Sequence, residues 1–329
     1  MINVEIIRGN QTESIHKVKS LVINSKNKVI FSTNNDSDYI YPRSAIKIFQ
    51  AIPLIYSGAA DFYNINEKQI SLSSSSHFAE NKHVHYLEKW LKIINIRETN
   101  LKCGIHNPLD LDSSNKLLLS GKKSSQIYNN CSGKHLGMIT TAKYKNYNIS
   151  DYTNFSHPIQ KTILSVLQKF TEFDACKSFK AVDGCGAPQY AFPIESLALA
   201  MSKLSCFDQL ELKISLSLHK LLYCIIKYPF FIGGTNRFDS EIITVTKGRI
   251  FCKLGAEGVL LFADMKKKYG GVLKVEDGNN RAIPSAAISL LKKLKSISSS
   301  EERKLKKWNP ELIYNFSKTK TGFIKCNKL

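Results

Sequence analysis

The sequence predicts an α+β fold, in which an antiparallel sheet built from both ends of the chain carries an inserted helical region. Three observations lead to this prediction. Strand-like alternation occurs near the N-terminus, apolar spacing of three and four dominates the middle of the chain, and strand-like segments return in the last third. We expect one domain over residues 1–329, with a sheet lobe of about 1–60 and 230–329 and a helical lobe of about 61–229.

The predicted strands come from both chain ends. Residues 2–8 alternate between apolar and polar side chains, and residues 16–23 and 29–31 read as two strands joined by a turn at 24–27. The chain therefore opens with an antiparallel element. Later strands are predicted over 241–246, 249–254, 257–263 and 271–276, with a hairpin turn at Lys247-Gly248 and a last edge strand within 310–329.

A buried helix is predicted after the N-terminal strands. Pro42-Arg43-Ser44 is typical of a helix start, and residues 45–52 are largely apolar, which indicates a helix that is buried on nearly all sides. The helix should end near Gly58, and Pro53 predicts a kink or an earlier stop because proline lacks the N–H of the helical hydrogen bond. Further helices are predicted over 80–96, 158–170, 193–203, 210–226 and 281–296.

The positive net charge of the chain is compatible with a nucleic-acid-binding protein. Forty-seven Lys and Arg against 27 Asp and Glu give a net charge of +20, and a basic surface attracts phosphate groups. The cations are spread along the chain, however, and their densest runs, 266–268 and 292–307, are typical of solvated faces or tails. We therefore expect no nucleic-acid partner and keep a basic nucleic-acid-binding zinc protein as the less favoured alternative.

Cysteine usage and hydropathy predict a cytoplasmic protein. Eight cysteines occur in 329 residues with 43% hydrophobic content, which can fill a core without disulfides. Residues 1–5 lack the charged head and apolar run of a signal peptide. No stretch approaches the roughly 18 apolar residues that a membrane span needs. We expect free thiols, a reducing compartment and no membrane partner.

Ser44 and Lys47 lie one helical turn apart at the start of the buried helix. A lysine can accept the proton of a serine hydroxyl if burial or nearby positive charge lowers its pKa. With Lys253-Leu254-Gly255 on a late strand and Tyr128-Asn129-Asn130 between, the order matches the SxxK, Tyr-x-Asn and K-[ST]-G elements of penicillin-recognising serine enzymes. The structural alternatives are an N-cap serine with a snorkelling lysine, and an ordinary lysine at a strand edge.

The stretch from Asn129 to His135 concentrates a thiol, a hydroxyl, an amine and an imidazole. If this turn is helical, Cys131, Lys134 and His135 share one face, and Cys185 in a Gly-rich loop supplies a second thiol. Two thiolates are good Zn²⁺ ligands. From chemistry alone, histidine is the default nitrogen ligand, because a lysine ligand must first lose its proton. Buried thiols without a metal are the alternative.

These segments give the chain a resemblance to the asparaginase II family, the rhizobial-type bacterial L-asparaginases. The matching pieces run in order over nearly the whole chain, and Asn-Asn-Cys-Ser-Gly-Lys-His and Asp-Gly-Cys-Gly-x-Pro are highly specific. The matching pieces are Val4-Glu5, Arg8-Gly9, Glu13-Ser14, His16, and residues 43–50, 76–83, 103–108, 129–137, 183–193 and 253–259.

The resemblance implies a serine β-lactamase-like fold, a homodimer, and hydrolysis of L-asparagine to L-aspartate and ammonia. Carried onto the matching positions, it implies that Ser44 with Lys47 and Ser76 with Lys253 are two Ser–Lys pairs. The structural alternative for Ser76 is a role as the cap of the helix that begins near Glu80.

The resemblance also implies a zinc site. Cys131, Lys134 and Cys185 resemble the zinc ligands of the family, so Lys134 takes the place that chemistry alone would give to His135. The Zn²⁺ ion is then expected to position the substrate rather than to generate the nucleophile. His135 becomes a polar wall of the pocket.

Three positions depart from the family pattern. Ile48 stands where the family usually has proline, and Ala79 stands where it usually has glycine. If that position requires a positive φ, alanine is costly there. The family often has a further cysteine near Arg237, where this chain has Asp239. Asp239 should alter the local charge and the substrate affinity.

A zwitterionic substrate needs charged groups of both signs. The candidates for its α-carboxylate are Arg43 and Arg237, and those for its ammonium group are Asp183, Glu80 and Glu257. Each could instead be a surface ion-pair member. The competing enzyme class is a penicillin-recognising-type serine hydrolase or amidase of another substrate, against which the expected absence of a signal peptide argues.

Overall fold

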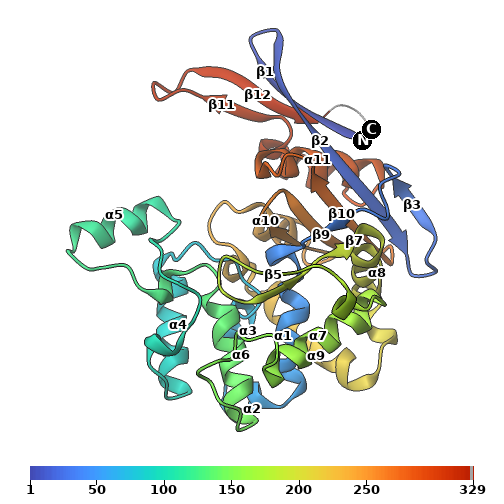
Figure 1. The fold of residues 1–329 in the computed structure, drawn as a ribbon. Helices are drawn as coiled ribbons and strands as arrows, with labels where there is room; N and C mark the ends of the chain where they lie inside the picture. Colours follow the sequence, from blue (N-terminus) through green and yellow to red (C-terminus); the bar gives the residue numbers. More distant parts are fainter. Residues whose placement is uncertain (327–328) are drawn as a thin grey trace.

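The structure is a computed structural model and describes residues 1–326 and 329. Its main sheet has eight strands in the order β11-β12-β1-β2-β10-β9-β8, with β3 paired to β2, and every ladder is antiparallel. Both chain ends build it, as predicted (Figure 1). Its strands are β1 (Ile2–Arg8), β2 (Gln11–Asn24), β3 (Val29–Ser32), β8 (Ile250–Gly255), β9 (Val259–Asp264), β10 (Tyr269–Val275), β11 (Glu311–Tyr314) and β12 (Lys320–Cys326).

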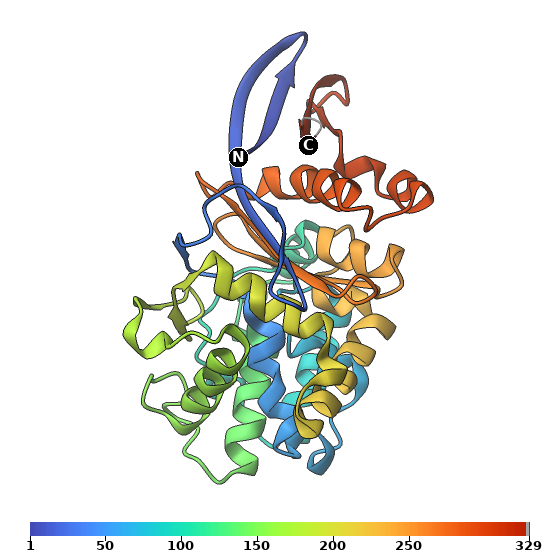
Figure 2. The ribbon, with the colours of Figure 1, turned by 90° about the vertical axis from the view of Figure 1, so that its right-hand side faces the viewer.

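The helical region is inserted between β3 and β8, and all of its helices except α10 (Phe238–Val245) lie on one side of the sheet, which Figure 2 shows edge-on. α8 (Ile194–Ser205) packs directly against β2, β9 and β10. The other helices of the region are α1 (Lys47–Tyr56), α2 (Ala59–Phe62), α3 (Glu67–Leu72), α4 (Asn81–Ile93), α5 (Leu111–Leu119), α6 (Ser132–Tyr144), α7 (Pro158–Thr171) and α9 (Leu212–Lys227). The small pairs β4 (Tyr39–Ile40) with β7 (Phe192–Pro193), and β5 (Lys180–Val182) with β6 (Pro188–Tyr190), border it.

The opposite side of the sheet carries α10 (Phe238–Val245), α11 (Ile283–Lys293) and α12 (Ser299–Lys304). Two hydrophobic clusters result, one between the sheet and the inserted helices and one between the sheet and α10 and α11. No helix in residues 1–326 is long and apolar enough to cross a bilayer. The α+β class predicted from the sequence is confirmed.

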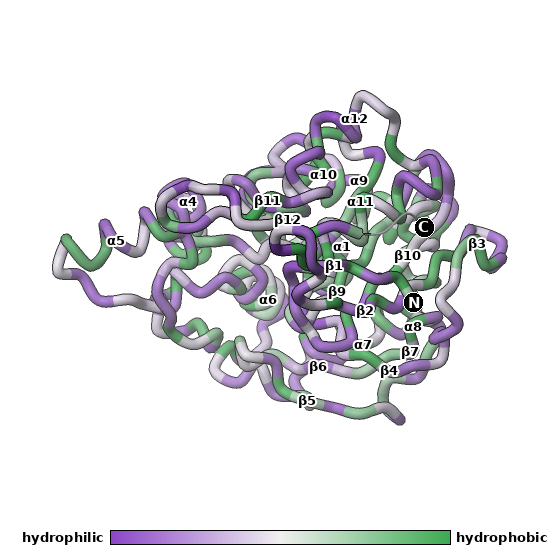
Figure 3. The backbone as a smooth tube through the Cα atoms, turned by 90° about the horizontal axis from the view of Figure 1, so that it is seen from above, coloured by the Kyte–Doolittle hydropathy of each residue, from purple (hydrophilic) through white to green (hydrophobic). Residues whose placement is uncertain are grey.

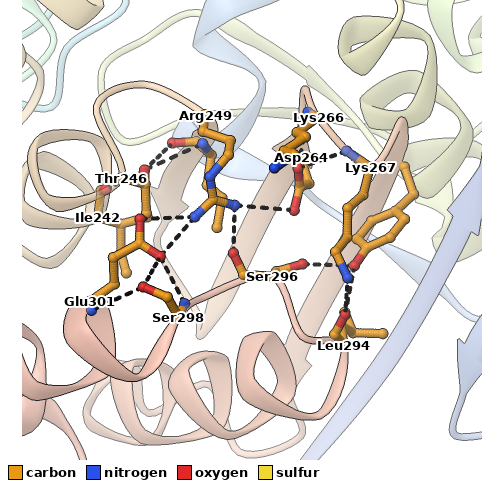
Figure 4. Close-up of polar contacts among 12 residues, drawn as sticks. Ile242, Thr246, Arg249, Asp264, Lys266, Lys267, Leu294, Ser296, Ser298 and Glu301 are labelled. Carbon is orange, nitrogen blue, oxygen red and sulfur yellow. Dashed lines mark hydrogen bonds and ion pairs between the residues drawn. The ribbon is translucent and has the colours of Figure 1, made fainter.

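An arginine network fastens the α11–α12 segment to the sheet (Figure 4). Arg249, just before β8, donates to both carboxylate oxygens of Glu301 at 2.9 Å and to the Ser296 carbonyl at 2.5 Å. Its guanidinium also lies 3.7 Å from Asp264 of β9. Because Asp264 is fully buried, this cation compensates a charge that would otherwise lack a counter-ion.

α1 is the buried helix that the apolar run predicts. Every side chain from Lys47 to Leu54 is buried, and the helix contacts α6, α7 and α9. Its first turn is a 3₁₀ helix, η1 (Arg43–Ile46). The predicted early stop at Pro53 does not occur, because proline this close to the helix end removes one hydrogen bond and the last turn continues to Tyr56.

Residues 241–246 were predicted as a strand, and this prediction is wrong. Residues 241–245 belong to α10 and Thr246 is its C-cap, and the first turn of the helix contains Asp239 and Glu241, acidic residues that favour a helix N-terminus. The β-branched residues of this run can be buried on a helix as well as on a strand, and Ile242 and Ile243 are both buried here. Lys247-Gly248 consequently ends a helix rather than forming a hairpin, and the Gly248 N–H donates to the Ile243 carbonyl at 2.8 Å.

α5 was not among the predicted helices. It projects from the side of the molecule (Figures 1 and 3), and Asp110 caps it by accepting a hydrogen bond from the Ser113 N–H at 2.8 Å. Only Leu117 is buried, whereas Leu118 and Leu119 are exposed. A helix without a continuous buried stripe leaves a weak periodic signal in the sequence.

Ala79 has the positive φ that would make glycine preferable. Its φ is 57°, in the left-handed region, and the residue is buried in the connection that leads into α4. Alanine in this conformation costs about 1–2 kcal/mol relative to an unstrained backbone.

We expect Ala79→Gly to be tolerated far better than an ordinary buried Ala→Gly change. The matched control is Ala142→Gly in α6, which removes an equally buried methyl group from a regular helix. The free energy of unfolding in urea should be about 1–2 kcal/mol higher for Ala79→Gly than for Ala142→Gly, because only the first relieves strain. Equal losses would show that Ala79 is unstrained.

Candidate active site

A cavity of about 430 Å³ lies where β8, η1, the loop before α4 and the loop before α10 meet. Of the predicted site residues, Ser44, Ser76, Arg237 and Lys253 line it. The remaining lining residues are Phe78, Asn130, Gly233, Asn236, Phe238, Asp239, Leu254, Gly255, Ala256, Asn280, Arg281, Pro284, Trp308 and Glu311.

A close approach of β8 to η1 brings Ser44 and Lys253 to one cavity. At Gly255 a Cβ atom would lie 2.5 Å from the Pro42 carbonyl oxygen and 3.2 Å from the Ala45 nitrogen. Glycine is therefore required for this contact, since real Cβ atoms do not approach backbone so closely. The Lys-Leu-Gly triplet thus serves as a contact surface for the serine-bearing turn, with Lys253 two residues before its glycine.

A second close approach positions the loop that carries Ser76. A Cβ atom at Gly133, in the first turn of α6, would lie 2.3 Å from the Leu72 carbonyl oxygen. The loop is also held by His77, whose Nε2 lies 2.9 Å from Ser132 Oγ. The glycine and serine of the Asn-Asn-Cys-Ser-Gly-Lys-His motif therefore support the Ser76 loop.

Lys47 is fully buried. Its Nζ is 2.6 Å from the Ser75 carbonyl oxygen and 3.0 Å from Ser76 Oγ. Burial lowers the pKa of Lys47, and this effect exceeds the opposing effect of the nearby Cys131 thiol. The contact joins Lys47 to Ser76, the serine of the other predicted Ser–Lys pair. Ser44 and Ser76 both border the cavity.

Lys253 is paired with a carboxylate. Its Nζ lies 2.8 Å from Asp239 Oδ2, and both side chains are buried. The negative charge that Asp239 adds, relative to the family pattern, therefore lies next to Lys253. Asp239 was not among the predicted site residues, although its departure from the family pattern singled it out.

Arg237 is the predicted carboxylate-binding residue that borders the cavity. Its Cζ lies 3.2 Å from the centroid of the Phe78 ring, so the guanidinium stacks on an aromatic face. Its Nε is buried and has no hydrogen-bond partner within the described chain. Burial lowers the pKa of Arg237, yet a guanidinium remains charged at any ordinary pH.

The other predicted binding residues contact protein groups. Arg43 Nε lies 2.7 Å from Asp183 Oδ1, and with Glu257 these two line a neighbouring hollow of about 400 Å³. The φ of Arg43 is 52°, so the residue before Ser44 is held in a strained conformation. Glu80 accepts hydrogen bonds from the N–H and the hydroxyl of Thr235, both at 2.7 Å, and so fixes the loop that borders the cavity.

His135 is fully buried in α6 and does not line the cavity. Its Nδ1 lies 2.6 Å from the Tyr152 hydroxyl, and its Nε2 is buried without a partner among the residues described. Burial lowers the pKa of His135 to about 3, which keeps the ring neutral.

Cys131, Lys134 and Cys185 converge in the interior. Lys134 Nζ lies 3.0 Å from Cys185 Sγ, and all three side chains are buried. The hydrogen bond from Cys131 and the charge of Lys134 hold the pKa of Cys185 well below its ordinary value in spite of burial. Its hydrogen bond to Cys185, together with burial, raises the pKa of Cys131 to about 12.

This donor set fits a metal ion once two protons leave. Burial lowers the pKa of Lys134, but the neighbouring sulfur charges outweigh it and the net shift is upward. An ion that binds here must therefore displace a proton from Lys134 and another from Cys131. Across residues 1–326, no cluster of three or more His, Cys, Asp and Glu side chains is arranged to hold a metal.

Several lining residues carry no motif in the sequence. Arg281, Trp308 and Glu311 come from the C-terminal part of the chain, and only the fold brings them to Ser44. Asn130, in contrast, belongs to the predicted Tyr-x-Asn element, and it borders the cavity as that element would. Its backbone N–H lies 3.0 Å from His106 Nε2.

One of the comparisons with known proteins, the family model, agrees with the resemblance seen in the sequence. The family model described as L-asparaginase II matches residues 4–326. A solved structure, described as a candidate beta-lactamase from Bacteroides dorei DSM 17855, is 10% identical and covers 84% of this chain and 94% of its own, with a TM-score of 0.44. No curated protein matches the chain significantly.

The contact at Gly255 leads to a stability prediction. Gly255→Ala should lower the free energy of unfolding by about 1–3 kcal/mol, because a methyl group at this position overlaps the Pro42 carbonyl. Gly184→Ala is the matched control, since its Cβ would meet only an arginine nitrogen at 4.0 Å. Similar urea midpoints for the two variants would contradict the required close approach.

Proposed function

The chain belongs to the L-asparaginase II family, and we propose that it hydrolyses L-asparagine to L-aspartate and ammonia in the cavity between Ser44 and Ser76. One observation carries the proposal beyond family membership. Ser44 and Ser76, from separate segments, both line this cavity, and the buried Lys47 has its Nζ 3.0 Å from Ser76 Oγ. A hydroxyl beside a buried amine is the arrangement that nucleophilic acyl transfer needs.

Ser44 is proposed as the nucleophile. Its Oγ attacks the side-chain amide carbon of asparagine, and its proton passes through the Ser76 hydroxyl to Lys47. Backbone N–H groups at the cavity stabilise the resulting oxyanion, a contribution of a few kcal/mol. The tetrahedral intermediate then expels ammonia, which takes the proton from Lys47. Lys47 then takes a proton from water, which attacks the aspartyl ester. The Ser44 oxygen leaves and regains its proton from Lys47 through the Ser76 hydroxyl, which restores both residues and releases L-aspartate.

Charged groups at the cavity are proposed to orient the zwitterionic substrate. Arg237 is suited to the α-carboxylate because its guanidinium borders the cavity and keeps an unpartnered Nε. Glu80 and Asp183 already bind Thr235 and Arg43. Glu311, which lines the same cavity, is therefore the better candidate for the ammonium group.

Cys131, Lys134 and Cys185 are the residues that would hold Zn²⁺. When bound, the ion would supply a fixed positive charge close to the reaction site, which orients a polar substrate. The protein contributes two soft sulfur donors and an amine in a buried position. The homodimer, the cytoplasmic location and the absence of a nucleic-acid partner stay predictions.

The two serines should respond differently to substitution. Ser44→Ala should reduce ammonia release from L-asparagine by roughly 10³-fold or more, because no covalent intermediate can form. Ser76→Ala should lose roughly 10²-fold, as expected for a group that only transfers a proton. A coupled assay for ammonia gives kcat and KM for each variant, and circular dichroism checks folding.

The reverse order of effects would identify Ser76 as the nucleophile. Near-normal turnover in both variants would exclude serine catalysis in this cavity. L-glutamine and nitrocefin serve as comparison substrates, since rapid hydrolysis of nitrocefin with no ammonia from L-asparagine would instead favour a penicillin-recognising hydrolase.

The metal site can be tested separately. The purified protein should contain about one Zn²⁺ per chain by elemental analysis, and Cys185→Ser should lose it and raise KM more than it lowers kcat. Cys224→Ser is the matched control, because Cys224 is equally buried in α9 but distant in the sequence from the proposed ligands. Protein without stoichiometric metal would contradict the zinc proposal and leave the serine mechanism intact.

A further inference from the structure

Asp239 and Lys253 form a buried ion pair in the cavity wall. Their side chains are 3% and 1% exposed, and Nζ and Oδ2 are 2.8 Å apart. Asp239 lies in the first turn of α10, and its Oδ1 accepts a hydrogen bond from the Ser240 N–H at 3.1 Å. The carboxylate therefore contacts both the lysine and the backbone at the start of α10.

Lys47 has different partners, although it is just as buried. Its Nζ contacts two neutral oxygens, the Ser75 carbonyl and the Ser76 hydroxyl. A buried amine with neutral partners gives up its proton more readily than one that is bonded to a carboxylate. The two lysines near the serines therefore differ in their partners, because Lys253 is paired with a carboxylate and Lys47 contacts neutral oxygens.

We propose that Asp239 is a positioning residue that keeps Lys253 as an ammonium ion, so that Lys253 acts as a fixed positive charge for the anionic part of the substrate while Lys47 alone acts as the base. This inference rests on the proposed amide hydrolysis. An ammonium group has three N–H donors, and Asp239 and the Leu254 carbonyl, at 3.3 Å, account for two. The third is available to a carboxylate or a developing oxyanion.

The loop before α10 restricts the carboxylate of Asp239. At Gly233 a Cβ atom would lie 2.8 Å from Asp239 Oδ1, so this backbone packs directly against the ion pair. The pair is thereby fixed from the loop side as well as from β8. The other titratable or charged groups near the pair or on the same cavity wall are Lys47 of α1, Cys252 of β8, Arg237, Arg281 and Glu311.

Substitution by arginine distinguishes a lysine that acts as a positive charge from one that acts as a base, because a guanidinium stays protonated. Lys253→Arg should retain kcat/KM for L-asparagine within roughly tenfold, whereas Lys253→Met should lose roughly 10²-fold or more, mainly through KM. Lys47→Arg should be as inactive as Lys47→Met. Equal inactivity of Lys253→Arg and Lys253→Met, with both folded, would overturn the inference.

Asp239→Asn tests the positioning role without changing the shape of the side chain. Without its counter-ion, Lys253 should lose its proton at lower pH, so kcat/KM should fall by roughly 10²-fold and acquire a new decline on the alkaline side. Asp264→Asn is the matched control, since it removes another buried carboxylate that does not line the cavity. An unchanged pH profile for Asp239→Asn would contradict the proposal.

A measurement without substrate keeps the inference testable if the proposed activity fails. The ¹⁵Nζ resonance of Lys253, assigned by its loss in Lys253→Arg, should show an ammonium group through pH 9 in the unsubstituted protein and an amine at lower pH in Asp239→Asn. An amine at neutral pH in the unsubstituted protein would overturn the inference. Absence of ammonia release alongside an ammonium signal would refute only the proposed reaction and the catalytic part of the inference.

Discussion

The site depends on how closely β8 approaches the turn that carries Ser44. The contact between Gly255 and Pro42 joins the sheet to the buried helix α1, which follows that turn without interruption. Everything else at the cavity is arranged around this contact, because Lys253 lies on the strand and Lys47 on the helix. The Ser76 loop is added from the side of α6 through the similar contact at Gly133.

Buried charge is distributed unevenly around this contact. Lys253 and Lys134 each face an anionic partner, Asp239 and Cys185 respectively, whereas Lys47 faces neutral oxygens. Three buried amines close together repel one another, and their different partners let this region fold with only part of the positive charge uncompensated. The same differences give each lysine a distinct chemical role in the proposed mechanism.

Structure could be predicted from the sequence where apolar residues recur at a regular spacing or where several chemically distinctive residues stand close together. It predicted the sheet from both chain ends, the buried helix, and the serines and lysine that line the cavity. It failed at residues 241–246, because a short β-branched run is equally compatible with a buried helix, and at α5, whose apolar side chains are mostly solvent-exposed. The contributions of Trp308 and Glu311 depend on long-range packing, for which single residues outside motifs give no local signal.

Pairing the two chain ends in one sheet also affects the order in which the protein can fold during synthesis. β2 gains its partner β10 only after residue 275 has been made, and β1 gains β12 only after residue 326. Until then, the N-terminal hairpin exposes unpaired strand edges of the kind that associate with other chains. A nascent chain therefore acquires the full cavity only after Glu311 has been made, and release before that residue would leave an aggregation-prone fragment without a complete cavity wall.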